Sequence, residues 1–368
     1  MQLLTKPNLD KLSTRRLSKK EATDLYKNAD LLELGKLAND VRKKHHPDTK
    51  PVTFIIDRNI NYTNICTASC RFCAFAFWPG DKRGYINSYE TIYQKTKELV
   101  DIGGTQVLLQ GGHNPELNID YYVDLFRRMK KDFPDVTLHA LSPSEIDHIC
   151  NVSNLDTETV LKKLVSAGLS SIPGGGAEIL VDRVRNIISP LKIKSDRWLE
   201  VMEVAHKLGL RTTATMMFGH VETLEERIEH MDKIRKLQDK TSGFTAFISW
   251  TFQEDNNPLG KEISKGTLWR APTSIDYLRT LAISRIYLDN IVNFQSSWVT
   301  QGIQIGQVAL AFGANDMGGT MLEENVVSAA GTCHKVPMNE IIHAIYLTGR
   351  DAAQRDTQYN ILKVIPRN

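Results

Sequence analysis

The sequence has little cysteine, no long apolar segment and almost no excess of charge of either sign. Only five cysteines occur in 368 residues, so a fold held together by disulfide bonds is not expected. No run approaches the roughly 18 consecutive apolar residues of a membrane span, and the basic N-terminal stretch lacks the apolar segment of a secretory signal. Lys and Arg number 46 against 43 Asp and Glu, which does not indicate a nucleic-acid surface. We expect a cytoplasmic protein with no membrane span and no nucleic-acid partner.

Three of the five cysteines are close together in the sequence, at Cys66, Cys70 and Cys73. Soft thiolates on one short loop are typical metal ligands. A structural zinc site normally has four ligands, often from two Cys pairs, and the sequence has no second pair. Three thiolates instead suit a 4Fe–4S cluster with one iron left open, although four cysteines are the usual number. Cys150 and Cys333 are interpreted as small buried apolar residues.

Strand-like and helix-like segments alternate along most of the chain. Residues 1–50 predict a charged cap of two or three helices, and residues 51–310 predict repeated βα units. The predicted strands are 53–61, 105–110, 137–141, 169–172, 211–218, 245–251 and 293–299, and the predicted helices are 89–101, 119–132, 157–167, 196–208, 224–238 and 275–289. This order favours an α/β fold, a (β/α)8 TIM-like barrel closed by a C-terminal segment of residues 311–368. An open doubly wound sheet is the alternative.

Glycine and polar residues follow seven of the predicted strands. In a β/α barrel the chemistry is located where strands run into the following loops, so these residues are candidates for the functional site. They include Gly111, Gly112, His113, His139, Ser142, Glu178, His220, Glu222 and Gln301. A histidine at any one of these positions is also compatible with a purely structural role. The glycines 174–176 are compatible with a loop that starts a helix, and a phosphate loop is the weaker interpretation because no Lys-Ser/Thr pair follows them.

Residues 61–75 resemble the signature of radical S-adenosylmethionine enzymes, in which an aromatic residue precedes the third cysteine as Phe72 does here. Three longer stretches, 172–180, 213–222 and 312–324, resemble a narrower family, the dehypoxanthine futalosine cyclases of the futalosine route to menaquinone. Aminofutalosine synthases and deazaflavin-forming synthases share the cysteine triad and the barrel, and they remain the nearest alternatives.

The resemblance implies a cofactor pair and a reaction. Cys66, Cys70 and Cys73 would bind a 4Fe–4S cluster, and its open iron would bind S-adenosylmethionine. A reductase or a flavodoxin- or ferredoxin-type donor would supply one electron. The resulting 5′-deoxyadenosyl radical would take a hydrogen from the ribose of a nucleoside-derived substrate, and the carbon radical would attack the attached benzoate ring. Loss of an electron and a proton would then leave a spiro ring.

The resemblance also implies residue roles. The expected S-adenosylmethionine contacts are Phe72, Gly111, Gly112, Ser142 and Glu178. The expected substrate contacts are His113, Gln301, Asp316 and Glu222. The final proton acceptor is expected to be a carboxylate or a histidine, with Glu222, His220 and Asp316 as the catalytic candidates. The stretch 315–320 is equally compatible with a turn that closes the barrel.

Two other classes of function remain open. One is a binding or scaffold protein with a zinc-filled cysteine loop. The other is a non-radical barrel enzyme with Glu222 and His220 as its acid and base and a structural cysteine cluster. Iron and sulfide content, and cleavage of S-adenosylmethionine, distinguish these classes from the radical enzyme.

Overall fold

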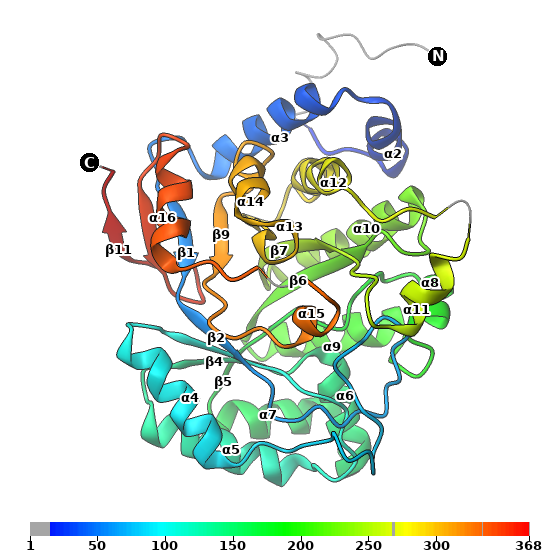
Figure 1. Ribbon diagram of the computed structural model, residues 1–368, viewed down its shortest axis with the longest axis vertical. Coiled ribbons are helices and arrows are strands. Elements are labelled where there is room, and N and C mark those ends of the chain that lie inside the picture. Colours follow the sequence, from blue (N-terminus) through cyan, green and yellow to red (C-terminus); the bar gives the residue numbers. More distant parts are fainter. Residues whose placement is uncertain (1–14, 267–268, 333, 368) are drawn as a thin grey trace.

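A computed structural model describes residues 15–266, 269–332 and 334–367. The chain forms one parallel sheet that curls back on itself, with helices on its outer face (Figure 1). The strands of the curled sheet are β1 (Val52–Ile55), β2 (Asp57–Ile60), β3 (Gln106–Leu109), β4 (Thr137–Ala140), β5 (Leu169–Ile172), β6 (Arg211–Phe218), β7 (Phe244–Thr251), β8 (Asn293–Gln295) and β9 (Asp316–Gly319).

The sheet closes through one nearly continuous strand. Only Ile56 separates β1 from β2. The β1 half pairs with β9, with Thr53 opposite Asp316, and the β2 half pairs with β3, with Asp57 opposite Gln106. Both ends of the sheet therefore meet in residues 52–60, which confirms the predicted barrel.

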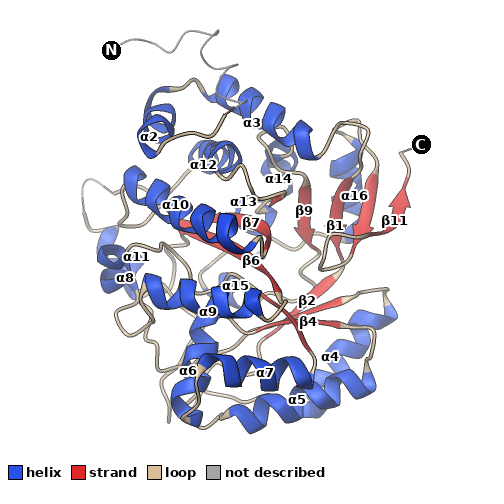
Figure 2. Cartoon of the chain, turned by 180° about the vertical axis from the view of Figure 1, so that it is seen from behind, coloured by secondary structure: helices blue, strands red, loops and turns tan. Residues whose placement is uncertain are grey.

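The helices that follow β2 mostly cover the outside of the barrel (Figure 2), although residues of the two four-residue helices, Trp298–Gln301 and Val326–Ala329, line its inside. The helices after β2 are α4 (Tyr89–Asp101), α5 (Ile119–Asp132), α6 (Pro143–Ser153), α7 (Thr157–Ala167), α8 (Asp182–Ile188), α9 (Ser195–Lys207), α10 (Leu224–Thr241), α11 (Pro258–Ile263), α12 (Ser274–Tyr287), α13 (Trp298–Gln301), α14 (Ile303–Ala309), α15 (Val326–Ala329) and α16 (Met338–Tyr346). Local sequence explains several ends. Thr223 and Glu226 form a capping box at the start of α10, and Gly168 ends α7 in the left-handed conformation. No described helix has the length and apolar character that crossing a membrane requires.

Two helices precede the barrel, α2 (Lys19–Asn28) and α3 (Leu31–His45). Tyr26 on α2 hydrogen-bonds Thr280 on α12, and Arg235 on α10 donates to the carbonyl of Leu17 (3.0 Å). The expected helical cap is present in the part of residues 1–50 that the structure describes. Residues 1–14 lie outside it.

The C-terminal part differs from the sequence prediction. The predicted strand 293–299 ends at Gln295, and α13 begins at Trp298 because its indole is buried and donates to the carbonyl of Gly319 (3.2 Å). The last barrel strand, β9, lies beyond residue 310. A further hairpin was not predicted: β10 (Ala352–Arg355) pairs with β1, and β11 (Ile361–Ile365) pairs with β10.

Candidate active site

The cysteine loop follows β2 and is fixed by hydrogen bonds to loops far away in the sequence. The amide of Thr67 donates to the carbonyl of His113 after β3 (3.1 Å). Arg71 donates through its amide to Ile188 and accepts at its carbonyl from the amide of Leu259, each at 2.8 Å. The loop is therefore supported by the barrel around it, as a site needing precise placement requires.

The three thiols suit a cluster. None is in a disulfide. Burial raises the pKa of Cys70 to about 12, and the other two thiols add to the rise. Such thiols become thiolates only beside a strong positive charge such as bound iron. Cys66 Sγ also accepts from the amides of His113 (3.3 Å) and Ala68 (3.4 Å), which stabilises a thiolate.

Among the described residues, no three potential ligands converge on a position for a single ion. A cluster instead binds each thiolate to a different iron. Cys150 is buried, as expected for an apolar role. Cys333 lies outside the described residues.

Gly112 packs directly beneath this loop. A Cβ at Gly112 would overlap the carbonyl oxygen of Ile65 and lie 2.8 Å from Cys66 Cβ, so only glycine fits. Next to it, the buried Glu145 accepts from the amide of Gly111 (2.9 Å) and from the amide of Ser142 (2.7 Å). The Ser142 hydroxyl in turn caps α6. These contacts tie the ends of β3 and β4 together beside the cysteines.

Glu178 and Lys192 form a charged pair next to Cys70. Lys192 Nζ lies 2.9 Å from Glu178 Oε1 and 5.7 Å from the centre of the Phe72 ring. Burial alone would lower the pKa of Lys192. The electrostatic interactions with Cys70 and Glu178 have the larger combined effect, so the pKa of Lys192 is raised. Glu178 Oε2 is buried without a hydrogen-bond partner among the described residues, and its ion pair with Arg185 is longer, at 3.6 Å. An acceptor with no donor beside the cluster loop fits a bound hydroxyl-bearing cofactor.

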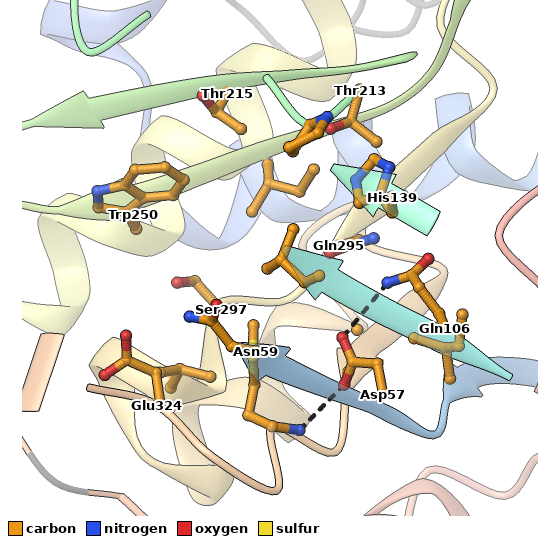
Figure 3. Close-up of a pocket in the computed structure, with 18 of the residues that line it drawn as sticks. Asp57, Asn59, Gln106, His139, Thr213, Thr215, Trp250, Gln295, Ser297 and Glu324 are labelled. Atoms are coloured by element: carbon orange, nitrogen blue, oxygen red, sulfur yellow. Dashed lines mark hydrogen bonds between the residues drawn. The ribbon is translucent and has the colours of Figure 1, made fainter. Parts of the chain in front are cut away.

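A cavity of about 260 Å³ occupies the inside of the barrel (Figure 3). Gln110 and Gly175 line it, and Gly175 belongs to the same loop as Glu178. Its wall includes Asp57, Asn59, Gln106, His139, Thr213, Thr215, Ile248, Trp250, Gln295 and Ser297. The side chains from these alternate strand positions point inward, as expected for a barrel.

The end of β10 and the segment after it form another part of the cavity wall. Arg355, Thr357 and Tyr359 line it. Thr357 Oγ1 donates to Gln106 Oε1 (2.8 Å), and Gln295 donates to Tyr359 Oη (3.0 Å).

Asp316 acts on the cavity only through Arg355. The Asp316 carboxylate is fully buried and accepts from Arg355 Nε (2.6 Å) and Nη2 (2.9 Å). It also accepts from Thr53 and from the amide of Gly318. Its carboxylate is thus committed to partners within the protein, and Arg355 is the member of the pair that lines the cavity.

Asp57 lies on the cavity wall and is only 3% exposed. Its carboxylate accepts from the amide of Met321 (3.1 Å) and from Gln106 Nε2 (3.4 Å), as Figure 3 shows. The pKa of Asp57 is raised to about 6, mainly by burial. The positive charge of Arg355 opposes this rise, and the negative charge of Asp316 adds to it. Beside it, Asn59 Oδ1 is buried with no hydrogen-bond partner among the described residues.

His220 and Glu222 are located elsewhere. Neither is among the described residues that line the cavity. The Glu222 side chain is completely buried and accepts from Arg227 Nη2 (2.7 Å) and from the amides of Gly219 (2.6 Å) and His220 (3.0 Å), and His220 Nδ1 lies 2.9 Å from it. Burial alone would raise the pKa of Glu222, but His220 and Arg227 hold it far below its usual range. This geometry favours a structural role over proton transfer.

His113 and Gln301 flank the cavity without lining it. The His113 ring stacks on His148 with centroids 5.0 Å apart. Burial, Lys192 and His148 hold the pKa of His113 well below its usual range. Gln301 donates to Thr251 Oγ1 (2.8 Å) and faces a second hollow of about 520 Å³, with Thr300 lining both.

The sequence analysis did not single out Asp57, Asn59, Lys192 or Arg355. The sequence does contain a pattern that could have identified Asp57 and Asn59. They are polar residues at alternating positions of the predicted strand 53–61, and alternating residues lie on the same face of a strand. Lys192 and Arg355 lie in an ordinary loop and at the end of a short strand. Their importance depends on partners distant in sequence.

Comparison with known proteins identifies the class. A model of the radical SAM superfamily matches residues 60–234. The crystal structure of methylornithine synthase superposes with a TM-score of 0.71 over 94% of this chain and 97% of that one, at 16% identity, a likeness of fold alone. With its loop of three cysteines at the barrel mouth, the chain belongs to the radical SAM superfamily, whose members use a 4Fe–4S cluster and S-adenosylmethionine.

The family within this class is also defined. A model of the CofH/MqnC C-terminal region matches residues 241–368. Cyclic dehypoxanthine futalosine synthase of Halalkalibacterium halodurans is 48% identical over 95% of this chain and 92% of that protein. A 5-amino-6-(D-ribitylamino)uracil–L-tyrosine 4-hydroxyphenyl transferase of Methanococcoides burtonii is 44% identical over 90% and 92%. The chain belongs to the family that includes cyclic dehypoxanthine futalosine synthase.

Proposed function

We propose that this protein converts dehypoxanthine futalosine to its cyclic form in the futalosine route to menaquinone. The observation that carries the proposal is the 48% identity to a cyclic dehypoxanthine futalosine synthase over nearly the whole chain. The site supports it, since the loop after β5 lines the partly polar barrel cavity through Gly175 and is linked to Phe72 of the three-thiol loop through the Glu178–Lys192 pair.

The residues at the barrel mouth hold the cofactors in this proposal. Cys66, Cys70 and Cys73 bind the 4Fe–4S cluster. Bound there, the cluster and S-adenosylmethionine supply a 5′-deoxyadenosyl radical. Glu178 offers its unpartnered Oε2 to the ribose hydroxyls of S-adenosylmethionine, and Lys192 orients that carboxylate by binding its other oxygen.

Other predicted contacts shape the same region. Phe72 packs beside Lys192, and Gly111, Gly112 and Ser142 keep the end of β3 close to the cysteine loop. His113 supports Cys66 through its amide.

The substrate binds in the barrel cavity. Walls from β2 to β9 exclude water, which protects a reactive radical from side reactions. Asn59 provides an unpartnered acceptor there, and Arg355, oriented by Asp316, provides a buried positive charge. Gln301 acts from the neighbouring hollow by orienting Thr251. We also propose an electron donor of the reductase, flavodoxin or ferredoxin type.

The test is anaerobic turnover. Reconstituted protein is mixed with dithionite, S-adenosylmethionine and dehypoxanthine futalosine, and the products are followed by mass spectrometry. The expected result is substrate-dependent formation of 5′-deoxyadenosine, together with a product that has lost two hydrogen atoms relative to the substrate.

Cys70→Ala is the matched control and is expected to form neither product. If wild-type protein with a verified cluster cleaves S-adenosylmethionine but leaves the substrate intact, the proposed substrate is wrong. The enolpyruvyl precursor of aminofutalosine is then the next compound to test.

A further inference from the structure

Two carboxylates line the barrel cavity among the described residues, Asp57 and Glu324 (Figure 3). They differ in what they already bind. Glu324 Oε1 and Oε2 accept from the amides of Val326, Val327 and Ser328 at 2.8 to 3.0 Å, so Glu324 caps the short helix α15. Its oxygens are occupied by backbone donors.

Asp57 is less firmly bound. One oxygen accepts the amide of Met321 at 3.1 Å, and the other has only the long contact with Gln106 Nε2 at 3.4 Å. Gln106 is itself oriented by Thr357, which donates to its carbonyl oxygen. A buried carboxylate oxygen with one long hydrogen bond, on the wall of a cavity, is well suited to accept a proton from a bound molecule.

The charged and titratable groups around Asp57 leave it as the proton acceptor on this wall. Arg355, the last residue of β10, is neutralised by its two hydrogen bonds to Asp316 on β9. His139 on β4 is fully buried, and burial with the charge of Arg355 lowers its pKa to about 3, so it is a weak base. Tyr359 is buried, and burial raises its pKa. By contrast, burial gives Asp57 a pKa of about 6, close to the pH at which it must act.

We propose that Asp57 is the catalytic base that takes the proton from the substrate ring after cyclisation. This proposal rests on the proposed function. In the step, the C–H bond at the newly substituted ring carbon breaks and its proton goes to Asp57 Oδ2. The two electrons of that bond stay in the ring. One electron then leaves the ring for an oxidised iron–sulfur cluster, and the aromatic system is restored.

The role of Asp57 differs from that of the residues at the barrel mouth. Formation of 5′-deoxyadenosine precedes the proton transfer, so removal of the base is expected to separate the two events. Gln106 is a positioning residue in this scheme, because it touches Asp57 rather than the substrate.

The experiment compares wild-type holoenzyme with Asp57→Asn, which conserves shape and removes the basic oxygen. We expect 5′-deoxyadenosine formation within about threefold of wild type, whereas the cyclised product falls by about 10²- to 10⁴-fold, the usual contribution of a general base. A substrate-derived radical is expected to accumulate in electron paramagnetic resonance spectra, and an isomer with the mass of the substrate is expected to replace the product.

Glu324→Gln is the comparison variant, because it neutralises the other carboxylate on the wall. Its ratio of product to 5′-deoxyadenosine is expected to fall less than tenfold. Asp57→Glu, which restores a base one methylene further out, is expected to recover part of the product.

The wild-type pH profile provides a measurement that needs no variant. The ratio of product to 5′-deoxyadenosine is expected to fall as the pH drops through about 6, because protonated Asp57 accepts no proton. A flat ratio between pH 5 and about 8 would overturn the proposal.

The outcomes with folded, cluster-loaded Asp57→Asn are also decisive. Full product formation overturns the proposal. Equal loss of product and 5′-deoxyadenosine overturns it too, because it indicates a role in binding. Failure of the wild-type protein to convert the substrate at all instead rejects the proposed function.

Discussion

Replacement of Glu222 by Gln tests whether the His220–Glu222 pair is structural or catalytic. The Glu222 side chain has no exposed surface, and the side chain of its partner Arg227 is 12% exposed. Arg227 also donates to Tyr26 on α2 (2.8 Å), so the pair joins the N-terminal helices to the barrel. The Gln variant leaves a largely buried guanidinium without its counter-charge.

The expected loss in unfolding free energy is about 3–5 kcal/mol, as for a buried ion pair that loses one partner. The unfolding entropy is about 2.1 cal/mol/K per residue, and the chain has 368 residues. Dividing the loss in free energy by the total unfolding entropy gives a fall of about 4–6 °C in the melting temperature. The assay is thermal unfolding followed by circular dichroism, together with turnover measured on the folded protein.

Two variants control this measurement. Glu229→Gln lies on α10, as Arg227 does, but breaks a long, half-exposed ion pair with Lys233 (3.6 Å), and it is expected to cost less than about 0.5 kcal/mol. Glu222→Gln combined with Arg227→Met removes both charges and is expected to recover part of the stability.

The pH dependence has a defined sign. The folded-state pKa of Glu222 is lowered, so its stabilisation is present above the unfolded value of 4.5 and is lost as the pH falls. The difference between wild type and Glu222→Gln therefore narrows in acid. An unchanged melting temperature with abolished turnover would refute the structural interpretation and restore Glu222 as a catalytic residue.

Three further predictions concern the site itself. Gly112→Ala is expected to displace the Ile65–Cys66 backbone, and iron and sulfide bound per chain after reconstitution should fall at least severalfold. Glu178→Gln is expected to raise the dissociation constant of S-adenosylmethionine, measured by calorimetry, by about 10- to 100-fold, the value of a hydrogen bond to a charged group; unchanged binding would remove Glu178 from the cofactor site. Asp57→Asn is expected to be more stable than wild type above pH 6, because the raised pKa of Asp57 gives a contribution that is full below about 3.8 and is lost as the pH rises through about 6. Chemical denaturation at pH 4 and at pH 8 checks this sign, and a constant difference would contradict it.

Much of the barrel was predictable from local sequence. Strands Leu169–Ile172 and Arg211–Phe218 and helix Tyr89–Asp101 begin and end where the pattern places them. Prediction was less accurate after residue 293, where burial of Trp298 ends a strand early. The β10–β11 hairpin was missed because its strands are short and β11 is mostly exposed.

The sequence alone determined the cysteine loop, since the spacing of Cys66, Cys70 and Cys73 places three thiols on one short segment whatever surrounds it. It also determined the alternation of strands and helices, because helix periodicity and capping are local properties. Only the tertiary structure decided which polar residues share the cavity. Asp57, Gln106 and Arg355 meet because residues 52–60 close the barrel and β10, which ends at Arg355, pairs with β1. Such contacts depend on strand register and closure, which link residues separated by hundreds of positions and leave no local pattern to read.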